Sequence, residues 1–165
     1  MTTATGPFVG LLLLSHGPLA NALRETVRML EPDEPDDIGA LSLAWDESPE
    51  AASRRLEKAI SEVNRGKGVV LLTDMFGGTP SNLALAFLDP GKIEIVTGIN
   101  LPMVVKARGL AREGRSPRDI AHTLVERGRR AIVAAAELVD GMPELQTRLA
   151  GFARPGGWLP GGTYP

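Results

Sequence analysis

Short apolar runs alternate with amphipathic stretches along most of the chain. Residues 8–14 (FVGLLLL) are uniformly apolar and are followed at once by Ser-His-Gly-Pro, a pattern typical of a strand buried on both faces. Residues 38–45, 68–73 and 93–97 predict three further strands. The clearest of these is 68–73 (GVVLLT), because it is short, apolar and rich in residues that favour strands.

The stretches between these runs have the spacing of helices that bury one face. Residues 19–30 carry an apolar side chain at every third or fourth position and predict a helix that ends before the EPDEPDD of residues 31–37. Ser48 and Ser116 each precede a proline, and both predict the N-cap of a helix. A further helix is predicted from Met103 to about Arg112.

This alternation predicts an α/β fold with a doubly wound, mostly parallel sheet and helices on both faces. We expect a single domain over residues 8–140. Residues 141–165 differ in composition, because they hold six Gly and four Pro, against thirteen and nine in the 140 residues before them. These 25 residues are predicted to form a disordered tail.

Charge and composition exclude several classes of function. The 165 residues include 18 Lys and Arg against 20 Asp and Glu, a balance that argues against a nucleic-acid partner. Because the chain has no Cys and only two His, we expect no metal site and no cofactor. The N-terminal segment lacks basic residues, and its apolar run is too short to span a membrane, which predicts a cytoplasmic protein without membrane insertion.

Polar side chains follow the predicted strands, where ligands of parallel α/β sheets bind. His16 follows the first strand, Asp74 the third and Asn100 the fourth. A carboxylate that holds one ring nitrogen of a histidine leaves the other as a nucleophile. The alternative interpretation is a half-buried His16 whose polar groups are satisfied by backbone. His122 lies in a polar helical stretch and is interpreted as a solvated residue.

The turn Gly77-Gly78-Thr79-Pro80 predicts an anion site. Glycines permit close approach of an anion, and backbone N–H groups at a helix start point outward. Thr79 is the predicted N-cap, with Pro80 as the first helical residue. Plain turns share this pattern, so the turn by itself leaves both readings open.

Three motifs together resemble a known family. They are LSHG at residues 14–17, LTDMFGGTPSN at 72–82 and TGINLPM at 97–103. In this order and spacing they are similar to the enzyme IIA component of the mannose-type bacterial sugar phosphotransferase system. The resemblance extends from about Val9 to Ala136.

The resemblance implies a phosphotransferase that works through a phosphohistidine. It would accept a phosphoryl group from phosphorylated HPr and pass it to a IIB component, in sugar uptake or in a regulatory relay. His16 matches the phosphorylated histidine, and Asp74 matches the carboxylate that orients its ring. The groups that receive the phosphoryl oxygens match Gly77, Gly78 and Thr79, and the residues that border the site match Ser15, Phe76, Asn100 and Pro102. Phe76 stands where Trp is frequent in the family, and the resemblance does not extend to a IIB domain of the kind that is fused to some members.

The resemblance also implies a homodimer that exchanges a strand near residues 130–135. The apolar pattern of that stretch is itself compatible with a helix or a strand.

A related alternative is the phosphocarrier subunit of a dihydroxyacetone kinase, whose third-strand motif usually lacks Gly-Gly-Thr-Pro. A phosphatase or mutase would need arginines beside the histidine, and no Arg follows His16 until Arg24. A His-dependent chelatase would need further metal ligands, and His122 is the only other histidine. A non-catalytic binding module is the remaining alternative if His16 is buried.

Overall fold

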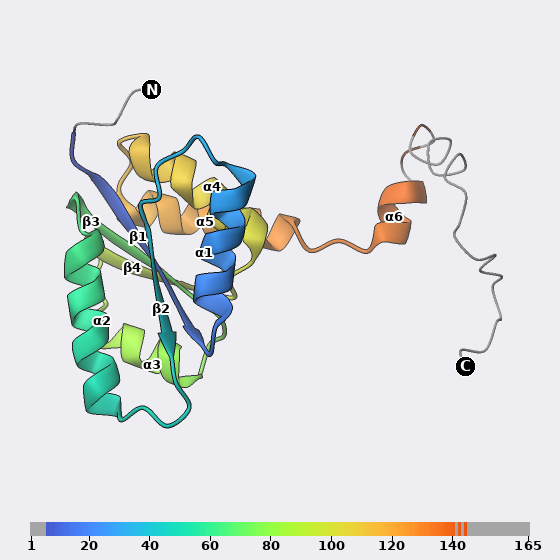
Figure 1. Ribbon diagram of the computed structural model, residues 1–165. Helices are drawn as coiled ribbons and strands as arrows, with labels where there is room; N and C mark the ends of the chain where they lie inside the picture. Colours follow the sequence, from blue (N-terminus) through green and yellow to red (C-terminus); the bar gives the residue numbers. More distant parts are fainter. Residues whose placement is uncertain (1–5, 141, 143, 145–165) are drawn as a thin grey trace, which may run out of the picture. The chain divides into compact units, whose positions relative to one another are not determined.

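The computed structural model describes residues 6–140, 142 and 144 (Figure 1). Residues up to Ala131 belong to one compact unit, and the chain from Ile132 onward belongs to a second. The first unit holds the whole sheet and all the predicted site residues. None of the described helices is long and apolar enough to cross a membrane.

Within the described residues the sheet has four strands, β1 (Phe8–His16), β2 (Ile38–Leu43), β3 (Gly66–Thr73) and β4 (Ile93–Thr97). Their order is β2-β1-β3-β4, and each pair of neighbours is parallel. The chain moves outward from β1 to β2 and then crosses back to β3 on the other side of β1. The topological switch point therefore lies between β1 and β3, where such sheets bind their ligands.

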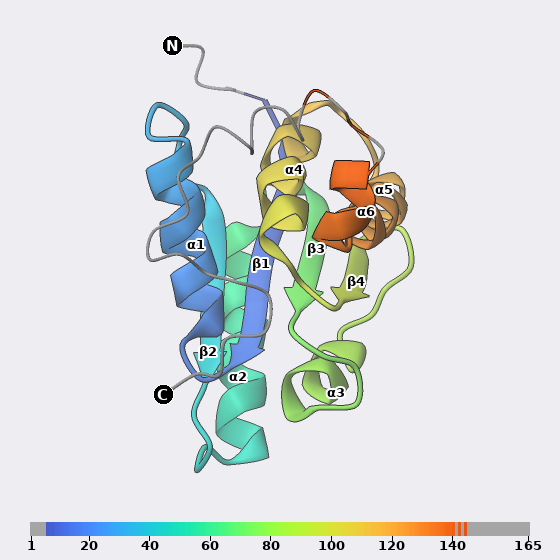
Figure 2. The same ribbon diagram turned by 90° about the vertical axis from the view of Figure 1, so that its right-hand side faces the viewer.

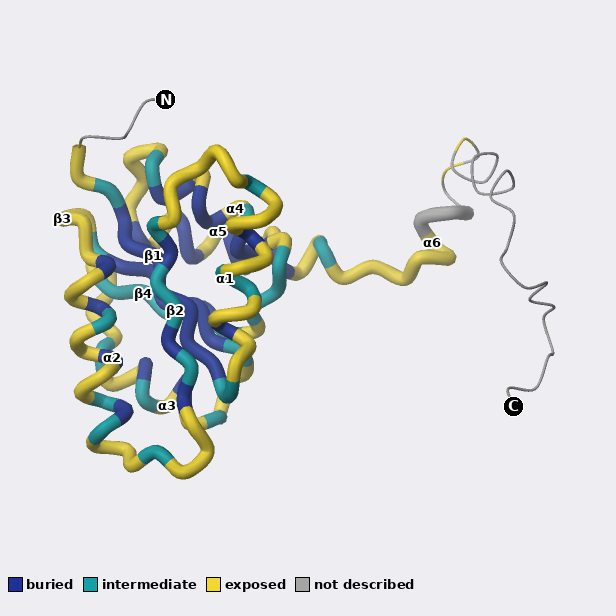
Figure 3. Tube along the Cα trace, in the orientation of Figure 1, coloured by how far each residue is buried: buried dark blue, intermediate teal, exposed yellow. Residues whose placement is uncertain are grey.

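Helices cover both faces of this sheet (Figures 1 and 2). Side chains alternate along β1, so that Leu11 and Leu13 face one cluster of buried residues while Leu12 and Leu14 face the other. Both clusters lie between the strands and the helices, and the buried strands stand out in Figure 3. The predicted doubly wound parallel sheet is confirmed. One face is covered by α1 (Leu19–Leu30), α4 (Leu101–Arg112) and α5 (Pro117–Arg130), and the other by α2 (Pro49–Val63) and α3 (Thr79–Leu85).

Of the three predicted N-caps, two are correct and one is wrong. The side chains of Ser48 and Ser116 each accept a hydrogen bond at 3.2 Å from the backbone N–H three residues later, as expected of N-caps. In α3 the N-cap is Gly78 rather than Thr79, because Gly78 has the extended backbone of a cap and Thr79 is already helical. The side chain of Thr79 is thereby left without a capping role.

The end of β2 also differs from the prediction. β2 ends at Leu43, two residues before the predicted end, so Trp45 lies in the loop between β2 and α2. The other boundaries shift only slightly, since β3 begins at Gly66 and α4 at Leu101.

The stretch expected to form an exchanged strand contains no strand in this chain. Helix α5 continues through Arg130, residues 132–134 lie in neither helix nor strand, and α6 (Ala135–Asp140) follows. A strand needs a neighbour that accepts its backbone hydrogen bonds, and among the described residues no strand pairs with this segment. The domain end at Asp140 stays a prediction. The predicted tail, residues 141–165, lies outside the described residues apart from Met142 and Glu144.

Candidate active site

Two predicted site residues meet at the switch point between β1 and β3. His16 ends β1 and Asp74 directly follows β3, and the pairing of Leu14 with Thr73 brings both to the same edge of the sheet. The backbone N–H of His16 donates a hydrogen bond to Asp74 Oδ2 at 2.8 Å. The ring nitrogen Nδ1 lies 2.8 Å from the same oxygen. Asp74 therefore holds both the main chain and the imidazole of His16.

Asp74 is ionised at neutral pH. Burial by itself would raise the pKa of this carboxyl group. The hydrogen bonds from the His16 amide, the His16 ring and the Met75 amide outweigh burial and hold the pKa below its ordinary value. An ionised acceptor at Nδ1 favours the tautomer with the proton on that nitrogen. This assignment leaves the lone pair on Nε2 of a ring whose side chain is 23% exposed.

The loop after Asp74 brings main chain close to the imidazole. Gly77 has a φ of +80°, which other residues rarely adopt. A Cβ atom at Gly78 would lie 2.5 Å from His16 Cε1 and 3.1 Å from Nε2. Only glycine therefore leaves room for the ring in this position. The backbone of Gly78 passes directly beside the edge of the ring that carries the free nitrogen.

This loop also presents unused hydrogen-bond donors. Between the described residues, no hydrogen bond uses the N–H group of Gly77 or Gly78, and Thr79 is the exposed first residue of α3. The first N–H groups of a helix have no partner within it. The carbonyl of Gly78 accepts hydrogen bonds at 3.0 Å from the Ser81 hydroxyl and from the Asn82 N–H, which hold the turn. The turn is thus fixed with the backbone of Gly78 next to the imidazole.

Trp45 contributes to this site and was missed in the sequence. Its indole stacks on the His16 imidazole, with 5.5 Å between ring centroids and 25° between ring planes. The predicted strand over residues 38–45 placed Trp45 inside the sheet rather than in a loop at its carboxyl edge. If the predicted strand had ended at Leu43, Trp45 would have followed a strand end, like the other predicted site residues.

The residues predicted to border the site have different surroundings. Ser15 is buried, and its hydroxyl accepts a hydrogen bond at 2.7 Å from the Ala20 N–H, which supports the start of α1. Phe76 is 73% exposed in the loop after Asp74. The Asn100 side chain accepts a hydrogen bond from the Met103 N–H at 3.1 Å and donates one to the carbonyl of Gly128 at 3.2 Å. Asn100 therefore caps α4 and links it to α5.

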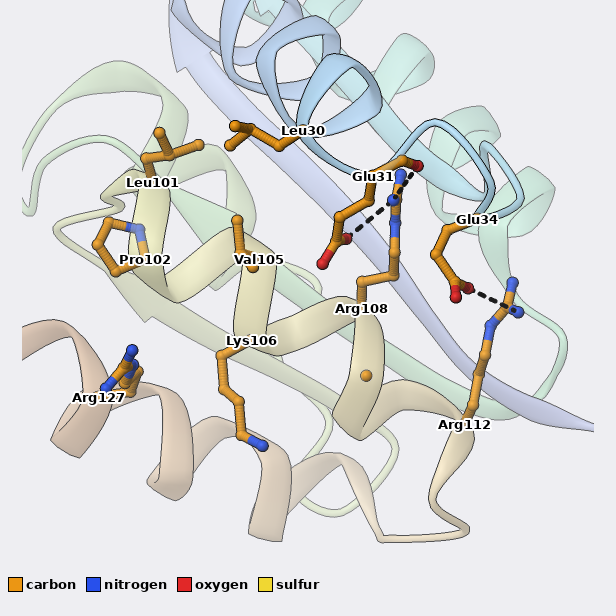
Figure 4. A pocket seen from close by; sticks show the side chains of 11 residues that line it. Leu30, Glu31, Glu34, Leu101, Pro102, Val105, Lys106, Arg108, Arg112 and Arg127 are labelled. Carbon is orange, nitrogen blue, oxygen red and sulfur yellow. Dashed lines mark hydrogen bonds and ion pairs between the residues drawn. The ribbon is translucent and has the colours of Figure 1, made fainter.

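Pro102 lines a cavity of about 520 Å³ that does not include His16 or Asp74 (Figure 4). The cavity lies against α1, α4 and α5, with Leu30 and Val105 among its apolar side chains. Ion pairs from Arg108 and Arg112 to glutamates of the α1–β2 connection cross one end. In the structure, the cavity and the His16–Asp74 pair are separate features.

The described part of the chain contains no cluster of three or more His, Cys, Asp or Glu side chains that could hold a metal ion. His122 is exposed on α5, as its polar surroundings in the sequence indicate. The chemistry available at the switch point is that of a histidine with one ring nitrogen held by a carboxylate and the other beside free N–H donors.

Comparison with known families gives a consistent result. A family model described as "PTS system fructose IIA component" matches residues 10–124. The chain is 27% identical over 127 residues to the mannose-specific EIIAB component of the PTS system of Escherichia coli strain K12, a match that covers 76% of this chain and 39% of that protein. The chain thus spans well under half of that relative. The fructose-specific EIIA component of Bacillus subtilis strain 168 is 24% identical over 133 residues, which are 80% of this chain and 90% of that protein.

Solved structures show the same fold. The PTS IIA protein associated with the fucose utilization operon of Streptococcus pneumoniae superposes with a TM-score of 0.70 at 25% identity, over 82% of this chain and 99% of that one. The mannose/sorbose-specific IIA subunit of Enterococcus faecalis superposes with a TM-score of 0.67 at 25% identity, over 76% and 93% of the two chains.

Proposed function

We propose that this chain, which belongs to the family of mannose-type IIA components of the sugar phosphotransferase system, is a cytoplasmic phosphocarrier. It takes a phosphoryl group from phosphorylated HPr onto His16 and passes it to a IIB component, in sugar uptake or in a regulatory relay. The observation that carries this proposal is the 2.8 Å contact between His16 Nδ1 and Asp74 Oδ2. That contact prepares Nε2 as the nucleophile.

In the transfer, the lone pair of Nε2 forms a bond to the phosphorus atom. The bond between phosphorus and the donor's ring nitrogen breaks in line, and its electron pair returns to the donor ring. The proton on His16 Nδ1 stays between the ring and Asp74 Oδ2. The imidazole becomes positively charged as the new bond forms, and the ionised Asp74 stabilises that charge.

The loop of residues 77–79 stabilises the phosphoryl oxygens. Phosphoryl transfer needs little covalent help beyond positioning and electrostatic stabilisation. The unused N–H groups of Gly77 and Gly78 and the exposed Thr79 are donors of the kind that phosphoryl oxygens require. Gly78 lies against the edge of the ring where the phosphoryl group is added. These donors receive the negative oxygens while the group moves between nitrogens.

We further propose that the protein is a homodimer in which the segment near residues 130–135 is exchanged as an edge strand. Among the described strands, β4 pairs only with β3, so its outer edge is open to another strand. Ile132 is 78% and Val133 55% exposed in the single chain, as expected for side chains that a second copy covers. Light scattering at micromolar concentration tests this assembly, and a monomer would contradict it.

Incubation with phosphorylated HPr tests the phosphocarrier function. We expect label on the wild type that is labile in acid and stable in alkali, as for a phosphoramidate, and no label on His16→Ala. The matched control is His122→Ala, which removes the other, exposed histidine and should be labelled like the wild type. Label on Ser15 or Thr79, or full labelling of His16→Ala, would contradict the proposal.

A further inference from the structure

Trp45 is an exposed tryptophan whose indole contacts the candidate nucleophile. The residue is 86% exposed, so burial in the core does not explain its position. Its ring stacks on the imidazole of His16 at a centroid distance of 5.5 Å, within the range of favourable aromatic pairs. The role assigned above to His16 and Asp74 does not use this contact.

The loop that carries Trp45 is anchored although its tip is exposed. The Glu47 carboxylate accepts hydrogen bonds from the guanidinium of Arg55 on α2, at 2.7 and 2.6 Å. Arg55 also donates to the carbonyl of Ser42 at the end of β2, at 3.3 Å. The hydrogen bond from Arg55 holds the pKa of Glu47 below its ordinary value, so the pair is charged at neutral pH. The loop is therefore anchored on both sides of Trp45.

We propose that Trp45 is a positioning residue for phosphoryl transfer, which covers one face of the His16 imidazole and keeps Nε2 directed toward the incoming group. This inference rests on the proposed function of His16. Asp74 holds the ring at Nδ1, and the Gly78 backbone limits it along the edge from Cε1 to Nε2. Neither contact restrains the faces of the ring. The indole of Trp45 stacks on one of these faces and restrains the ring in that direction.

The stacked indole leaves the reaction path open. The lone pair of Nε2 lies in the plane of the imidazole, so an approach in line with it does not cross the face that Trp45 covers. The indole also favours the transfer electrostatically, because the ring gains positive charge as the bond to phosphorus forms. The face of a tryptophan attracts a cation more than a neutral ring. Trp45 therefore stabilises the product ring more than the free one.

Single-turnover kinetics with phosphorylated HPr test this role. We expect the limiting rate of phosphorylation of Trp45→Leu to fall about three- to tenfold, the range that corresponds to one aromatic pair. The HPr concentration at half-saturation should stay unchanged. Trp45→Phe should retain most of the rate, because a smaller aromatic ring still covers the imidazole face. The matched control is Met29→Ala, which removes another exposed apolar side chain, 73% exposed on α1, and should react like the wild type.

The outcomes separate this inference from the proposed function. A raised half-saturation concentration with an unchanged limiting rate would show that Trp45 binds the donor, and would overturn the positioning role. An unchanged rate in Trp45→Leu, with a wild type that is labelled on His16, would overturn this role alone. A wild type that takes no label on His16 would overturn the proposed function and this role together.

Nuclear magnetic resonance tests the contact itself, independently of any donor. In the unphosphorylated protein we expect nuclear Overhauser contacts between the indole protons of Trp45 and the ring protons of His16. These contacts should persist in Met29→Ala. Their absence in the wild type would overturn the inference, whatever the kinetics show.

Discussion

The two ends of the sheet unit each hold a carboxylate paired with a basic side chain, yet the pairs have different consequences. At the carboxyl edge, Asp74 holds His16. At the opposite end, where α1 runs back along the sheet, Glu31 pairs with Arg108 of α4 at 2.9 Å. The Arg108 side chain is 3% exposed, whereas that of His16 is 23% exposed. The basic side chain is therefore enclosed in the Arg108–Glu31 pair, whereas in the His16–Asp74 pair it borders solvent.

The difference lies in which atoms remain free after the pair has formed. Arg108 uses its guanidinium on both the side chain and the carbonyl of Glu31, and so fastens the α1–β2 connection to α4. It has no lone pair to offer a substrate. His16 has two ring nitrogens, and Asp74 occupies only Nδ1. The same kind of contact is therefore structural at one end, and at the other it leaves a ring nitrogen free for the nucleophilic role that we propose for His16.

The largest effect is expected for Asp74→Asn. The amide is neutral, so it neither stabilises the positive ring nor favours the reactive tautomer as strongly. We expect the rate of His16 phosphorylation to fall by roughly 10² to 10⁴, the range of positioned proton-transfer and orienting groups. Unfolding in urea should show a loss of only about 1 kcal/mol, because an amide oxygen can still accept hydrogen bonds. A rate within threefold of the wild type would contradict the proposal that Asp74 prepares His16 for phosphorylation.

The opposite pattern is expected for Glu31→Gln. Without its carboxylate the buried Arg108 loses its charged partner, and we expect a loss of about 2 to 3 kcal/mol in the free energy of unfolding. This estimate is below that for a fully buried pair, because the Glu31 side chain is 32% exposed. The phosphorylation rate at a temperature where the variant is folded should be unchanged. The control is Glu25→Gln, which removes an exposed pair with Arg28 and should leave stability unaltered.

Two glycine variants in the loop beside His16 distinguish the effect of displacing the imidazole ring from the effect of straining the backbone. The added methyl of Gly78→Ala collides with His16 and should slow phosphorylation about tenfold to a hundredfold by displacing the ring. Gly77→Ala adds a methyl in open space but at a φ of +80°, and should cost about 1 kcal/mol of stability. The ring signals of His16 in nuclear magnetic resonance should shift in Gly78→Ala and stay nearly in place in Gly77→Ala. Equal shifts in both would contradict this separation.

The smallest effect is expected from acid. The pKa of Asp74 is lowered in the folded protein, so the folded state binds protons less readily than the unfolded chain. The stability that this carboxylate contributes is fully present above its ordinary pKa of 3.8, and is lost as the pH falls through the lower, folded value. The difference in unfolding free energy between the wild type and Asp74→Asn should therefore shrink as the pH falls below 3.8. A difference that grows as the pH falls below 3.8 would contradict the direction of the shift.

Much of this organisation is already present in local sequence. The uniform apolar run before Ser15 predicts a strand buried on both faces, and the helix caps at Ser48 and Ser116 follow from side chains that bond to nearby backbone. The meeting of His16 and Asp74 was also predictable, because parallel strands place their carboxyl ends at one edge of the sheet. The N-cap at Thr79 was not, because backbone conformation selected Gly78 instead.

The sequence by itself determined the α/β class, the order of strands and helices, and the two residues that meet at the switch point. These follow from hydrophobic periodicity and from residue types that act over a few positions. Tertiary structure alone decided that Trp45 covers the His16 ring, that the Asn100 side chain donates a hydrogen bond to Gly128 of α5, and that Pro102 belongs to a separate cavity. Each of these depends on how segments distant in sequence pack together. The local pattern of residues does not predict these contacts, because the packing of whole helices and strands determines which distant segments meet.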